Sequence, residues 1–151
     1  MGDTHAGSKL NRLRSLRRTL TPYLAISVGG ALGANTRYLV GTWVTTQWGT
    51  QFPVGTLLIN VSGSFVIGLY LTLATERFTG HPAVRLLVAT GFLGAYTTFS
   101  TFSVEALRLI ETGDAAAAIS YMVASVVLCI LAAAIGMFVA HTLLSRSARG
   151  L

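Results

Sequence analysis

Apolar residues form four long blocks along this chain, separated by short polar segments. A helix that spans a membrane needs about 20 mostly apolar residues. The blocks cover approximately residues 23–44, 54–73, 83–109 and 115–143. The segments between them contain Gly, Pro or polar residues, at which helices commonly stop. The pattern therefore predicts an all-α membrane protein with four transmembrane helices.

The third block is interrupted by the stretch "GFLGAYTTFSTFSVEAL", residues 91–107. It holds two glycines, six hydroxyl side chains and a glutamate. Irregular backbone and carboxylates at membrane depth must be satisfied by protein, water or an ion. We therefore expect the third helix to be broken near mid-membrane, within residues 91–98, where Gly91 and Gly94 permit the break.

Polar and aromatic side chains in three of the blocks recur at helical spacing. The rows are Thr56, Asn60, Ser64 and Gly68 in the second block, Phe99, Phe102 and Glu105 with Ser100 and Ser103 beside them in the third, and Tyr121 and Ser125 in the fourth. Taken singly, each residue has a structural alternative, such as a bond between helices, a bond to a helix carbonyl or core packing. Together, the rows indicate a polar route through the membrane.

The side chains of these rows suit a small anion. Amide and hydroxyl groups donate hydrogen bonds, and a phenyl ring has an electropositive edge. No Asp or Glu occurs in the first, second or fourth block, which argues against a cation route. The lone Arg37 supplies positive potential near an entrance. No Cys/His cluster or nucleophile–base pair is evident, so an enzyme is not expected, and Cys129 is interpreted as an inert buried thiol.

Composition limits what else the chain contains. Of its 151 residues, 52% are hydrophobic and 11% are charged, against about 25% charged in a typical soluble domain. We expect a basic cytoplasmic tail at 1–21, a membrane domain at 22–145 and a short C-terminal tail at 146–151. Four helices enclose too little space for a wide pore, so oligomerisation is expected.

The net charge of +6 is concentrated in the tail segment "KLNRLRSLRR". In a soluble protein such a run suggests nucleic acid. Because it precedes an apolar block, we expect instead an anchor at the cytoplasmic membrane surface, lying as a short helix on the headgroups. The apolar block is too long for the core of a signal peptide, so we expect an uncleaved first helix.

Basic residues are also unequal on the two sides of the predicted membrane. One side carries nine: Lys9, Arg12, Arg14, Arg17, Arg18, Arg77, Arg85, Arg146 and Arg149. The other carries only Arg108, and Arg37 lies inside. The positive-inside rule then predicts that both termini are cytoplasmic.

Gly29, Gly33 and Gly41 lie at four-residue steps on the face of the first block that also carries Arg37. Small residues at this spacing let helix backbones approach closely. The pattern fits equally a contact between subunits and packing within one chain.

Three segments resemble the small bacterial fluoride channels known as the Fluc or CrcB family. They are "GGALGANTRY", "GTLLINVSGSFVIG" and "GFLGAYTTFSTFSVE", and the Tyr-xxx-Ser spacing of Tyr121 and Ser125 also matches. The similarity covers about residues 25–140. It implies an antiparallel dimer of dual-topology type, with two narrow fluoride pores between the subunits, in the plasma membrane of a prokaryote.

The resemblance also implies roles for individual residues. The expected fluoride-pore residues are Asn60, Phe99, Phe102, Tyr121, Ser125, Thr56, Ser100 and Ser103. Arg37 and Glu105 are expected to be vestibule or structural charges. A structural sodium ion at the dimer interface is expected on the main-chain carbonyls of Gly94 and Thr97 from both subunits.

Two matters stay open at this point. The main rival function is a small proton-coupled four-span exporter, which uses a carboxylate deep in its first helix, and the first block here has none. The dimer partner is either a second copy or a homologous chain inserted the other way, and the strong charge bias favours the latter. Besides fluoride and lipid, no nucleic-acid partner is expected.

Overall fold

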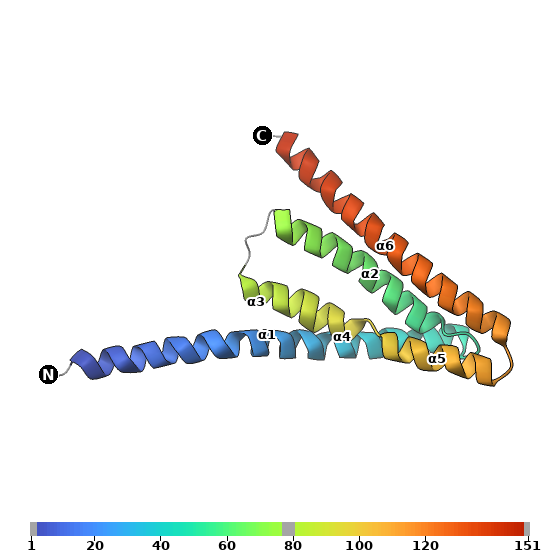
Figure 1. Ribbon diagram of the computed structural model, residues 1–151, viewed down its shortest axis with the longest axis horizontal. Coiled ribbons are helices and arrows are strands. Elements are labelled where there is room, and N and C mark those ends of the chain that lie inside the picture. Colours follow the sequence, from blue (N-terminus) through green and yellow to red (C-terminus); the bar gives the residue numbers. More distant parts are fainter. Residues whose placement is uncertain (1–2, 77–80, 150–151) are drawn as a thin grey trace.

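The computed structural model describes residues 3–76 and 81–149, and every regular element within them is helical. The elements are α1 (Asp3–Trp48), α2 (Val54–Glu76), α3 (Pro82–Arg85), the π-helix η1 (Leu86–Leu93), α4 (Gly94–Tyr96), α5 (Phe99–Glu111) and α6 (Ala115–Arg149). Figure 1 shows α2 and α6 side by side, with the η1–α4 stretch lying along α1. The all-α class is confirmed for the described residues.

Two of the described helices are long and apolar enough to cross a membrane by length and composition, over Val54–Thr75 and Ala115–Arg146. The other two predicted blocks lack this property for identifiable reasons. In α1, Asn35 and Arg37 lower the hydropathy of the central turns, and the third block is divided into short helices.

Helix α1 continues without interruption from the basic tail into the first apolar block, through Pro22. Its 46 residues span about 69 Å, more than twice the roughly 30 Å of a bilayer core. The tail is thus the first part of α1, and not the separate short helix that the sequence suggested (Figure 1). Residues 1–2, Arg77 and residues 150–151 lie outside the described residues.

Glycines bring α1 and η1 into close contact. A Cβ at Gly29 would overlap the carbonyl oxygen of Leu87, and one at Gly33 would overlap that of Phe92. For these two glycines the structure therefore shows packing within the chain. Gly41 differs, because its nearest neighbour for an added Cβ is Ile59 Cδ1 at 3.9 Å.

The third block loses its helical backbone at two threonines. Thr97 has φ −78° and ψ 156°, and Thr98 has φ −150° and ψ 118°, so both are extended. Gly94, in contrast, is helical with φ −65° and ψ −31°. The expectation that Gly91 and Gly94 permit the break was therefore wrong. Gly91 serves close packing instead, since an added Cβ would lie 2.9 Å from Gly29 Cα.

Candidate functional site

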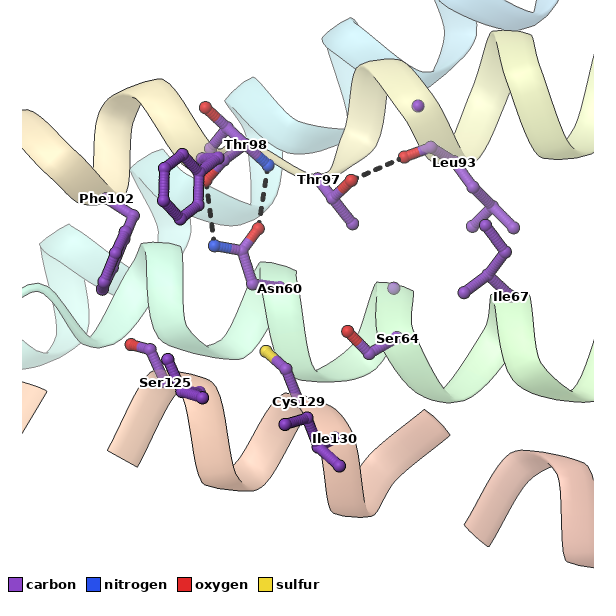
Figure 2. A pocket seen from close by; sticks show the side chains of 14 residues that line it. Asn60, Ser64, Ile67, Leu93, Thr97, Thr98, Phe102, Ser125, Cys129 and Ile130 are labelled. Carbon is purple, nitrogen blue, oxygen red and sulfur yellow. Dashed lines mark hydrogen bonds between the residues drawn. The ribbon is translucent and has the colours of Figure 1, made fainter. Parts of the chain in front are cut away.

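Asn60 on α2 holds the extended segment between α4 and α5. Its Oδ1 accepts a hydrogen bond from the backbone N–H of Thr98 (2.8 Å), and its Nδ2 donates to the carbonyl of Thr98 (3.0 Å). Figure 2 shows this pair of bonds reaching across from α2. An amide nitrogen carries two hydrogens, so the bond to Thr98 leaves Asn60 one further N–H.

The same contact changes the bonding of Gly94. In a continued helix, the N–H of Thr98 would bond to the carbonyl of Gly94, four residues earlier. That N–H donates to Asn60 Oδ1 instead. The Gly94 carbonyl oxygen therefore lacks its usual helical donor and can accept a bond from another group.

Thr98 also begins α5. Its Oγ1 accepts from the backbone N–H of Thr101 (3.2 Å), which satisfies one of the free N–H groups at a helix start. Ser100 Oγ lies 3.3 Å from the same oxygen. The helix therefore starts at a fixed residue, and this positions Phe99 and Phe102 at its first two turns.

A pocket of about 380 Å³ lies between α2, α6 and the η1–α5 stretch. Its lining includes four of the predicted pore residues, Asn60, Phe99, Phe102 and Ser125, and also Gly94 and Thr97. The pocket therefore brings together the predicted amide donor, the two phenyl rings and one of the predicted pore hydroxyls, that of Ser125. It also places the predicted sodium ligands on its wall.

The two phenylalanines of this pocket differ in exposure. Phe102 is buried and its ring lies 5.1 Å from that of Tyr121 and 5.3 Å from that of Phe99, between centroids. Phe99 is 77% exposed in the single chain. Phe99 therefore lines the pocket while most of its surface stays uncovered in the single chain.

Ser125 carries an unsatisfied polar group. Its Oγ is the one buried side-chain polar atom without a hydrogen-bond partner among the described residues, and the side chain is 6% exposed. Buried hydroxyls normally have a partner, and leaving one unpaired costs about 1–3 kcal/mol. Since Ser125 lines the pocket, a small molecule or ion inside it can supply the missing bond.

Glu105 joins three helices through its carboxylate. Thr56 Oγ1 donates to Oε1 (2.9 Å) and the Tyr121 hydroxyl donates to Oε2 (2.7 Å). Tyr121 is fully buried and Thr56 nearly so. Because each hydroxyl carries one hydrogen, neither can donate to an anion while Glu105 accepts it.

A second pocket, of about 1030 Å³, is lined by Arg37, Thr56, Glu105 and Arg108 among others. It contains both signs of charge, whereas the first pocket contains none. Thr98 lines both pockets. The extended segment therefore separates a charged chamber, with Arg37 on its wall, from an uncharged one that holds the phenyl rings.

Three predicted pore residues line neither pocket: Ser100, Ser103 and Tyr121. Ser103 donates to the carbonyl of Phe99 (2.9 Å) within its own helix. Sequence reasoning gave no role to Thr98, although threonine is among the residues preferred immediately before a helix start. It also interpreted Cys129 as inert, whereas the half-buried side chain lines the first pocket, four residues after Ser125.

Comparison with known proteins identifies relatives over most of the chain. The family described as "CrcB-like protein, Camphor Resistance (CrcB)" matches residues 24–137. A protein of Acidobacterium capsulatum named "Fluoride-specific ion channel FluC" is 48% identical over 123 residues, which are 82% of this chain and 98% of that protein. Proteins with the same name from Rhizobium leguminosarum bv. trifolii and Chloroflexus aurantiacus are 48% and 49% identical, over 80% and 75% of this chain and 96% and 90% of theirs. The chain therefore belongs to the CrcB family.

Proposed function

We propose that this chain is a fluoride-selective ion channel that lets cytoplasmic fluoride leave the cell passively and so relieves fluoride toxicity. The observation that carries the proposal is the uncharged pocket lined by Asn60, two phenyl rings and Ser125, whose buried hydroxyl is unpaired. The identity of the ion, fluoride, comes from the names of the relatives. No catalytic step is part of this function.

Fluoride is small and tightly hydrated, so a pore must replace its water with donors that still release it. The Ser125 hydroxyl and the second N–H of Asn60 are such donors. The edges of Phe99 and Phe102 add weak positive potential without a full charge. Arg37 attracts anions to the charged chamber on the other side of Thr98. Residues 22–145 form the channel domain in this proposal.

The proposed active form is an antiparallel dimer of four-span subunits, with the interruption of the third helix near mid-membrane. The exposed ring of Phe99 supports a partner that completes the pocket wall. The exposed apolar side chains of α6, such as Ile130 and Phe138, face lipid or that partner. Four other predicted pore hydroxyls can donate to the ion only if they give up their present hydrogen bonds: those of Thr56, Tyr121, Ser100 and Ser103.

The freed carbonyl of Gly94, with that of Thr97, fits the proposed sodium site at the dimer interface. Uncharged oxygen atoms suit a hard cation, and Asn60 leaves the Gly94 oxygen without its helical donor. Sodium bound there would satisfy carbonyl oxygens from both chains. Exchange of sodium for N-methylglucamine is expected to lower the thermal midpoint of the purified dimer, and an unchanged midpoint would argue against the site.

The charge bias supports one main orientation, with both termini cytoplasmic, and a homologous inverted chain as partner. Arg12, Arg17 and Arg18 are exposed on α1 before the apolar part begins. A cysteine added near the C-terminus is expected to react with impermeant reagents mainly from the cytoplasmic side. Equal reaction from both sides of the membrane would instead show dual topology and a homodimer.

The function is tested by fluoride efflux from liposomes that contain the purified chain, with valinomycin to carry potassium and no proton gradient. Fast efflux of fluoride but not chloride is expected. A proton-coupled exporter would instead require the gradient, and no acidic residue lies between Tyr23 and Val44 to couple it.

Phe99→Ile and Phe102→Ile keep apolar bulk but remove the ring edge. Each is expected to lower fluoride efflux at least about tenfold, which corresponds to a loss of roughly 1.4 kcal/mol, while elution volume stays unchanged. Wild-type efflux in both variants would show that the rings only pack the core.

A further inference from the structure

Three side chains follow one another at four-residue steps on α6: Tyr121, Ser125 and Cys129. At this spacing they share one helix face. Tyr121 and Ser125 are buried, and Ser125 and Cys129 line the uncharged pocket. Figure 2 shows the Cys129 sulfur directed from α6 toward α2, in the same pocket as Asn60 and Ser64. The row of side chains on α6 that we place along the fluoride route therefore includes the thiol of Cys129.

The pocket at this thiol also carries the unpaired hydroxyl of Ser125, one helical turn away and 6% exposed. That hydroxyl has no partner among the described residues, and a solute in the pocket can supply one. We therefore expect water and small anions to reach this part of α6. A thiol in such a place meets dissolved reagents, whereas a thiol packed in hydrocarbon does not.

We propose that Cys129 lines the anion route and is a modification site at which a small mixed disulfide closes the channel. The proposal rests on the proposed function. The added group extends the side chain into the pocket that Asn60 and Ser64 also line. It places an apolar methyl group where a dehydrated anion needs hydrogen-bond donors, so the anion loses its replacement for water.

Methyl methanethiosulfonate is the probe for this site. The Cys129 thiolate attacks the divalent sulfur of the reagent, the one in its CH3–S group, and not the sulfonyl sulfur. A new S–S bond forms, and the S–S bond of the reagent breaks. Methanesulfinate leaves with the electron pair of the broken bond, and the thiol proton passes to water. Because Cys129 is the only cysteine of the chain, the reagent can form one mixed disulfide per subunit.

Treatment of reconstituted protein is expected to lower fluoride efflux to below roughly a tenth of its untreated rate, and dithiothreitol is expected to restore it. In Cys129→Ala, the ratio of treated to untreated efflux is expected to stay near one. The mass of the intact subunit reports how much adduct has formed, independently of any flux.

Cys129→Met provides a permanent mimic, because one methylene replaces one sulfur of the adduct and the shape is retained. We expect this variant to elute like the unmodified protein and to conduct below roughly a tenth of its rate. Recovery of efflux by dithiothreitol in the modified wild-type protein separates channel closure from misfolding.

Two results would overturn the proposal: complete adduct formation by mass with unchanged efflux, or no adduct on the folded protein while the unfolded chain reacts. Absence of fluoride efflux from untreated protein would reject the proposed function, and this proposal with it. That failure is recognised before any reagent is added.

Discussion

Replacing Asn60 by aspartate is expected to lower fluoride efflux from liposomes by at least about a hundredfold. Aspartate has no N–H group, so the bond to the Thr98 carbonyl and the spare donor are both lost. Its charge also faces the proposed path. A like charge about 4 Å away costs about 4 kcal/mol at an effective dielectric constant of 20, which corresponds to roughly a thousandfold.

Asn60→Ala is the matched control, because it removes both bonds to Thr98 without adding charge. Alanine is expected to retain more efflux than aspartate, and the difference measures repulsion of the anion. Equal loss in the two variants would mean that Asn60 acts only by holding the extended segment. An efflux rate in Asn60→Asp equal to that of the wild type would show that Asn60 does not line the fluoride route.

The largest expected effect on stability is that of Gly29→Ala. The added methyl group would overlap the carbonyl oxygen of Leu87 and lie 2.9 Å from the backbone nitrogen of Phe92. Backbone atoms of a packed helix cannot move aside as a side chain can, so α1 and η1 must separate. We expect a loss above about 3 kcal/mol, at the upper end of the range for overpacked sites, seen as a lower thermal midpoint and poor yield.

The neighbouring Gly30 provides the comparison, since a Cβ there would meet nothing within 4 Å. Alanine favours a helix over glycine by about 1 kcal/mol, so Gly30→Ala is expected to leave the thermal midpoint unchanged or raise it. A similar loss in both variants would show that glycine flexibility, and not the close contact with η1, matters in this part of α1.

The sequence by itself determined the helical class and the membership of the polar rows. Helical spacing places Ser125 four residues after Tyr121 on one face, whatever that face contacts. It also located the interrupted third block, because glycines and hydroxyl side chains are concentrated in residues 91–107. These features are local in the chain, and hydrophobic pattern and spacing are sufficient to identify them.

Only the tertiary structure decided which groups satisfy one another. The break lies at Thr97 and Thr98 because Asn60, 38 residues before Thr98, takes both hydrogen-bonding groups of that peptide backbone. The hydroxyls of Thr56 and Tyr121 likewise donate to Glu105, a residue distant from both in the sequence. Each choice depends on a neighbour that is distant in sequence, and a periodic pattern shows the face that a residue occupies but not the group that it meets.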